Sequence, residues 1–142
     1  MATFFKFNAF VENLAEGVHN LAANTLKVYL TNATPDAAAD SIKTDLAEIS
    51  AGNGYTVGGV TMTVSSSSQT SGTYRLVLAD NSITASGGTI PSFRYAVLYN
   101  DSTTSPLDAL IGAWDYGSSI SLADGESLSI DCDGTTGVLS IA

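Results

Sequence analysis

The chain has 142 residues, of which 44% are hydrophobic and only 13% are charged, and this balance suits one domain with one buried core. Fourteen acidic residues against five basic ones leave a net charge of −9, which excludes nucleic acid as an expected partner because phosphate backbones are repelled. No apolar run is long enough for a membrane span and the N-terminus lacks a signal-peptide pattern, so we expect no membrane segment and synthesis in the cytoplasm.

The first twenty residues predict an arm followed by a helix. Residues 1–7 contain three of the five phenylalanines and carry no helix signal, so we expect an N-terminal arm. Apolar residues then recur at helical spacing, Asn8 can serve as the N-cap, and Gly17 can stop the helix. These signals predict one short amphipathic helix over residues 8–17, at the start of a single domain that spans residues 8–142.

The stretch "TLKVYLTN" predicts the first strand of that domain, because the side chains alternate along it. The alternation would bury Leu26, Val28 and Leu30 and would expose Lys27 and Tyr29. The chain then changes character, since residues 35–54 are rich in alanine and acidic residues and end in glycines. This Ala-rich insertion fits a short helix and an ordered loop equally well.

The rest of the chain predicts short strands separated by turns. It is rich in serine and threonine, of which the whole chain has 18 and 16, and threonine in particular favours strands. We expect "SSSSQTSG" to be a polar loop, Pro91 to lie at a strand start or an edge, and Asp124-Gly125 to form a hairpin turn. Turn signals recur about every ten residues, which predicts a mainly β chain folded as an antiparallel β-sandwich or a jelly-roll-like domain.

The stretch "FRYAVLYND", residues 93–101, predicts a central strand. Phe93, Tyr95, Val97 and Tyr99 share one parity, and the other parity is also apolar apart from Arg94. A strand that is apolar on both faces is covered on both sides, so these aromatics are expected in the core rather than on a ligand platform. Arg94 should pair with a carboxylate, and the second arginine, Arg75, is expected in a neighbouring strand.

The residues that could carry chemistry form no catalytic or metal-binding pattern. His19 has no nucleophile motif beside it, so we interpret it as structural. The run from Asp131 to Gly134 is similar to the opening of a calcium loop but lacks the distal glutamate, so a turn is the preferred interpretation. Cys132 is expected to be a small apolar core residue, and no metal or cofactor is expected.

Aromatic residues leave one alternative open. Trp114 and Tyr116 in "GAWDYGSS" could stack on a sugar, since aromatic rings beside acidic groups are what carbohydrate recognition uses. Aromatic side chains on strands are nevertheless more often core residues or cross-strand pairs. The sequence therefore ranks a sugar platform below a structural role for this pair.

Five stretches of the chain are long enough to carry a resemblance. They are "GNGYTVGG" (52–59), "SQTSGTYRLVLAD" (68–80), "TASGGTIPSFRYAVLYND" (84–101), "LIGAWDYGSSISLADGES" (110–127) and "GVLSIA" (137–142). Together with "FNAFVENLAEGVHNL" and "LKVYLTN" near the N-terminus, they resemble a family of small virion structural proteins of tailed bacteriophages. The resemblance covers almost the whole chain.

The resemblance implies a capsid decoration (cement) protein, for which no catalytic residues or cofactors are expected. The implied partners are the phage major capsid protein and further copies of the chain, as dimers or trimers, on the outer surface of the virion after synthesis in the host bacterial cytoplasm. Phe4, Phe5 and Phe7 of the arm are the candidate contacts with the capsid or a neighbouring subunit. Two alternatives stay open, a tail or fibre component of the virion and a carbohydrate-binding module that contacts host polysaccharide.

Overall fold

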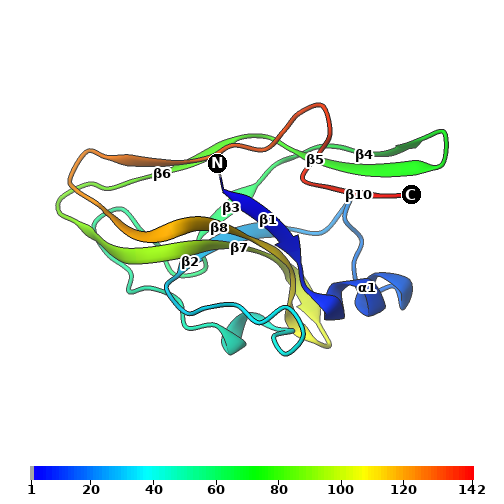
Figure 1. Cartoon of the computed structure of the whole chain (residues 1–142), viewed down its shortest axis with the longest axis horizontal. Helices are drawn as coiled ribbons and strands as arrows, with labels where there is room; N and C mark the ends of the chain where they lie inside the picture. The colour runs from blue at the N-terminus through cyan, green and yellow to red at the C-terminus, as the bar shows by residue number, and fades with distance from the viewer. Residues whose placement is uncertain (1) are drawn as a thin grey trace.

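The computed structural model describes residues 2–142, in which it contains ten β-strands and one α-helix (Figure 1). In chain order the elements are β1 (Thr3–Lys6), α1 (Asn8–Ala15), β2 (Leu26–Thr31), the 3-10 turn η1 (Lys43–Asp45), β3 (Val60–Met62), β4 (Val64–Thr70), β5 (Thr73–Leu78), β6 (Asn81–Thr84), β7 (Ile90–Thr104), β8 (Leu107–Leu122), β9 (Ser127–Ile130) and β10 (Leu139–Ile141). All strand pairs are antiparallel. The prediction of a mainly β chain with one short N-terminal helix is confirmed, and no helix within residues 2–142 has the length and apolar character needed to cross a membrane.

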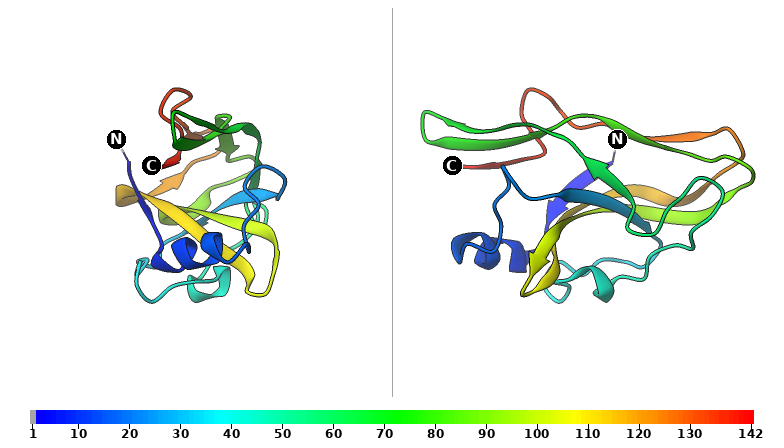
Figure 2. Two further views of the ribbon diagram at one scale, coloured as in Figure 1. Left: turned by 90° about the vertical axis from the view of Figure 1, so that its right-hand side faces the viewer. Right: turned by 180° about the vertical axis from the view of Figure 1, so that it is seen from behind.

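The strands form two layers that face each other, as in a sandwich (Figures 1 and 2). One layer is a five-stranded sheet in the order β1-β8-β7-β2-β3, and we call it the large sheet. The other layer combines a three-stranded sheet, β10-β5-β4, with the pair β6-β9. Both β9 and β10 lie in the C-terminal part of the chain and pair with the consecutive strands β6 and β5.

A continuous apolar core fills the space between the two layers. The large sheet contributes Leu26, Val28, Leu30, Leu98 and Ile111, and the second layer contributes Leu76, Leu78, Ile83 and Ile130, all at most 6% exposed. The predicted inward face of β2 is therefore confirmed. Each such side chain stabilises the fold by about 1.5–3 kcal/mol relative to full exposure, so this core is the main link between the layers.

The opposite face of the large sheet carries a second core. Its members include Tyr29, Val97, Tyr99, Leu110 and Leu46, the last of which comes from the insertion. The prediction that Tyr29 is exposed is wrong, because the insertion folds back over this face and leaves the Tyr29 side chain 0% exposed. Between residues 35 and 54 the only regular element is the 3-10 turn η1, so the ordered-loop alternative describes the insertion.

Glu48 fixes the insertion to the sheet through three hydrogen bonds. Its Oε1 accepts from the Tyr55 hydroxyl and from the Gly58 N–H, each at 2.7 Å, and its Oε2 accepts from Lys43 Nζ at 2.6 Å. The Tyr55 hydroxyl in turn accepts the main-chain N–H of Leu30 in β2 at 2.9 Å. A single carboxylate therefore joins the middle of the insertion to the chain that follows it and, through Tyr55, to β2.

The stretch 93–101 lies in β7 at the centre of the large sheet, between β2 and β8. The prediction of a strand covered on both faces is confirmed, because Tyr95, Val97 and Tyr99 lie in the second core and Leu98 lies in the core between the layers. The predicted parity shared by Phe93, Tyr95, Val97 and Tyr99 does not hold at Phe93, the first residue of the stretch. The register with β8 shifts between Phe93 and Tyr95, and this irregularity turns Phe93 into the core between the layers.

Two turn predictions need correction. Asp124-Gly125 does form a turn, with Gly125 at φ 88°, but it joins β8 of the large sheet to β9 of the second layer instead of closing a hairpin. The run from Ser65 to Thr70 is not a loop, since it forms most of β4, and the turn is the shorter Ser71-Gly72. Four consecutive serines leave β4 without an apolar alternation, so its pairing with β5 decides the structure.

The arginine predictions have different outcomes. Arg94 pairs with Asp115 of the adjacent strand β8, as expected. Arg75 lies in β5 of the second layer, so the prediction that it neighbours the strand of Arg94 is wrong. Pro91 is the second residue of β7, close to the strand start as predicted.

The N-terminal segment is part of the large sheet. Residues Thr3–Lys6 form β1, which pairs with β8 along four residues, and this differs from the expected free arm. Phe7 is 0% exposed in the second core and occupies the N-cap position of α1, where Asn8 was expected. The helix ends at Ala15, and Gly17 follows at φ 79°, close to its predicted stop.

Candidate binding groove between the layers

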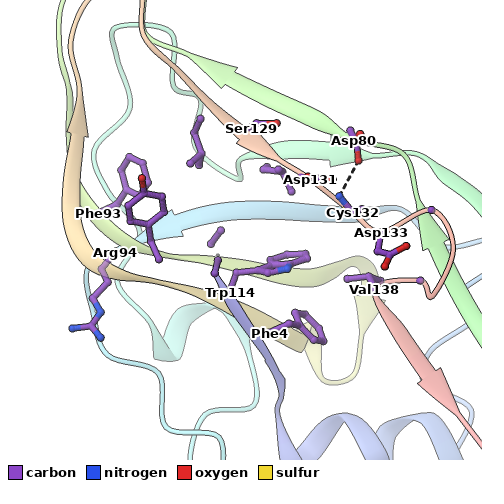
Figure 3. Close-up of a pocket in the computed structure, with 17 residues that line it drawn as sticks. Phe4, Asp80, Phe93, Arg94, Trp114, Ser129, Asp131, Cys132, Asp133 and Val138 are labelled. Carbon is purple, nitrogen blue, oxygen red and sulfur yellow. Dashed lines mark hydrogen bonds between the residues drawn. The ribbon is translucent and has the colours of Figure 1, made fainter.

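A groove of about 720 Å³ opens between the edge of the large sheet and the C-terminal part of the second layer (Figure 3). Its floor consists of side chains from β1, β7 and β8, and its opposite wall is the chain from Leu128 to Val138. This volume lies within the range of about 300–1,000 Å³ that is typical of ligand sites.

The floor of the groove is aromatic. Phe4 of β1 and Trp114 of β8 are cross-strand partners whose ring centroids lie 4.9 Å apart, and both side chains are half-buried. Their approach depends on Gly112, because a Cβ there would lie 2.4 Å from Phe4 Cζ. Tyr116 lies further along β8 and is 52% exposed. The groove therefore presents apolar ring surface that the chain itself leaves partly uncovered.

The opposite wall is held by hydrogen bonds. The main-chain N–H of Cys132 donates to Asp80 Oδ1 at 2.8 Å (Figure 3). Asp133 closes the following turn, since its carboxylate accepts from the N–H of Thr135 at 2.7 Å and from the hydroxyl of Thr136 at 2.7 Å. The run that is similar to a calcium loop is thus a turn, as preferred, and the Asp133 carboxylate already has partners within it.

The polar groups of the groove carry a net negative charge. Arg94 donates to both carboxylate oxygens of Asp115, at 2.8 and 2.9 Å. The hydrogen bonds of this ion pair lower the pKa of Asp115 and raise the pKa of Arg94. Hydrogen bonds from Thr136 lower the pKa of Asp133. With Arg94 neutralised by its partner, the exposed carboxylates of Asp80, Asp131 and Asp133 form an acidic rim.

Cys132 lines the groove but is not a reactive thiol. Its side chain is 5% exposed, and burial, together with the neighbouring acids, raises the pKa of the thiol to about 11. The protonated form dominates at neutral pH, and a thiol is a poor nucleophile and metal ligand in that form. Its predicted place as a small core residue is confirmed, since it belongs to the core between the layers.

His19 also has a structural place, away from the groove. It is 6% exposed, and its Nδ1 lies 3.1 Å from Asn100 Nδ2, so Nδ1 accepts and the proton resides on Nε2. Burial lowers the pKa of His19 to about 4, which keeps the ring neutral at physiological pH. Asn100 Nδ2 also donates to Asn24 Oδ1 at 2.8 Å, so this group links the chain after α1 to β7.

The structure separates the three phenylalanines that the sequence grouped. Phe4 points into the groove, whereas Phe5 and Phe7 lie on the opposite face against the second core. Because Phe7 has no exposed surface, contact between this side chain and another chain would require it to leave the core. Trp114 and Tyr116, singled out for sugar stacking, do line the same groove as Phe4.

Sequence reasoning missed the opposite wall of the groove. Leu128, Asp133 and Val138 are more than 100 residues from Phe4 in the chain, and only the pairing of strands brings them together. No local motif marks that pairing. A weak signal was available, since the chain from Asp131 to Gly134 is acidic and follows an apolar alternation.

No group of three or more histidine, cysteine, aspartate or glutamate side chains in residues 2–142 is placed to hold a metal ion. In comparisons with known proteins, no protein-family model, curated protein or solved structure matches the chain.

Proposed function

We propose that this chain is a structural protein of a tailed-phage virion, a decoration protein that binds the outer surface of the assembled capsid and stabilises the head. The observation that carries the proposal is the groove, a surface of half-buried rings between two rigid layers and beside the edge strand β1. Such a surface suits binding to another protein. The sequence resemblance to small virion structural proteins supplies the identity of that partner.

The architecture supports a role in which many copies act together. Two cores and the Glu48 hydrogen bonds hold each copy in one shape, so little order has to be gained when it binds. Each contact with the shell can then be modest. Because the contacts repeat over the capsid lattice, many of them must break together before the layer of decoration protein is lost.

The proposal is tested by co-sedimentation with purified empty shells of the encoding phage. The protein should saturate the shells at a fixed ratio to the major capsid protein and should raise their temperature of disruption. The matched control is the same mixture with isolated tails, which should bind none. Binding to tails alone would favour the alternative of a tail or fibre component.

A carbohydrate-binding module is the second candidate, favoured by one observation. Trp114 and Tyr116 lie in one groove together with the carboxylates of Asp131 and Asp133, and this combination suits stacking on a sugar. Saturable binding of host polysaccharide, measured by calorimetry and lost in Tyr116→Ala, would support it. Unchanged binding in that variant would exclude the groove as the sugar site.

A further inference from the structure

We infer that the groove binds an extended segment of the shell subunit, which adds as a strand to the free edge of β1. The inference rests on the proposed function and names the part of the partner that the groove recognises. The segment would carry apolar side chains at alternate positions and at least one lysine or arginine. Three observations support this occupant.

The first observation is the free edge of β1. Within residues 2–142, β1 is the end strand of the large sheet and pairs only with β8. The Phe7 N–H donates to Ile111 O at 3.1 Å, and main-chain groups of successive residues in a strand point to opposite edges. The N–H and C=O groups of Phe4 and Lys6 therefore point away from β8. These groups are what an added strand would use.

The second observation is the position of the groove relative to that edge. Phe4 points into the groove, and Lys6 has the same parity in β1. In an added strand, every second side chain would lie on this same face of the sheet. Those side chains would enter the groove beside Trp114, below Leu128 and Val138, where apolar surface is left uncovered. This geometry accounts for apolar residues at alternate positions.

The third observation is charge. Arg94 is neutralised by Asp115, so Asp80, Asp131 and Asp133 leave the rim acidic, on a chain whose net charge is −9. An acidic segment would be repelled, whereas a lysine or arginine could reach the rim from a neighbouring position of the added strand. Charge complementarity therefore selects a basic segment.

The test measures binding of wild-type protein and variants to purified empty shells. Lys6→Pro removes an N–H that points to the free edge and should weaken binding by about fivefold to tenfold, while Lys6→Ala, which keeps that N–H, should bind within about twofold of wild type. Asp131→Lys should weaken binding by about three- to tenfold, most strongly at low salt, and the control Glu16→Lys on the exposed end of α1 should not. Thermal unfolding of each variant shows that the fold is retained.

A second measurement does not depend on variants. Hydrogen exchange of the Phe4 and Lys6 amides should slow by at least about tenfold when the wild-type protein is bound to shells, because an added strand accepts both N–H groups. Exchange that is unchanged at both amides, or variants that all bind like wild type, would overturn this inference while leaving the decoration function intact. Absence of wild-type binding to shells would overturn both. Protection of the groove by polysaccharide and not by shells would assign it to a sugar instead.

Discussion

Replacing Glu48 with alanine tests how the insertion is held on the sheet. The Glu48 side chain is 11% exposed and accepts hydrogen bonds from Tyr55, Gly58 and Lys43. The Lys43 side chain is 17% exposed. The substitution leaves an ammonium group and two further donors without their acceptor. Removal of one partner of a buried ion pair costs about 3–5 kcal/mol, and we expect about 3 kcal/mol because Lys43 can turn partly to water.

The assay is urea unfolding. The free energies of unfolding are compared between variants whose free energy falls with urea concentration at the same slope. Glu48→Ala should be about 3 kcal/mol less stable than wild type, whereas Glu16→Ala, at an exposed position of the chain, should lie within about 0.5 kcal/mol. The double variant Glu48→Ala/Lys43→Met should recover about 1–2 kcal/mol, because it removes the unpaired ammonium. A loss below about 1 kcal/mol in Glu48→Ala would refute the view that this carboxylate anchors the insertion.

Three further predictions concern single residues. The pKa of His19 is lowered from 6.5 to about 4, so the unfolded chain takes up the proton at a higher pH than the folded chain. The contribution of His19 to the free energy of unfolding is therefore complete above pH 6.5, and about 3 kcal/mol of it is lost as the pH falls to 4. In urea unfolding at several pH values, His19→Gln should lack this part of the fall. Gly59→Ala should prevent folding, as judged by circular dichroism, because φ is +75° and the new Cβ would lie 1.8 Å from Val28 O. The control Gly72→Ala, whose Cβ would have no atom within 4 Å, should lower the free energy of unfolding by only about 1 kcal/mol. A folded Gly59→Ala protein would contradict the packing. Cys132, whose pKa is raised to about 11, should react with a thiol reagent at pH 8 at least about 100 times more slowly in native than in unfolded protein, and equal rates would contradict its burial.

Local pattern predicted the elements of this fold better than their partners. The strand over residues 93–101 was expected to be covered on both faces because both parities are apolar, and both cores confirm it. The irregularity that turns Phe93 to the other face depends on where β8 slips against β7, and side-chain type does not show this. The burial of Tyr29 depends on the insertion, whose fold-back is likewise non-local.

The same limit applies to the groove. Phe4 and Trp114 could each be recognised as aromatic residues, but their contact follows from the pairing of β1 with β8, which are more than 100 residues apart. The turn at Asp124-Gly125 was predictable from its residues, whereas its passage between the layers was not. A tight turn fixes only the local backbone, and the hydrophobic faces of the following strand decide which sheet it joins.

The central claim, that the chain decorates a capsid, is tested most directly by its copy number in purified virions. Quantitative mass spectrometry of heads separated from tails should find the protein in the head fraction, at a fixed ratio to the major capsid protein that reflects the lattice symmetry. A few copies per particle, recovered with the tails, would contradict the claim.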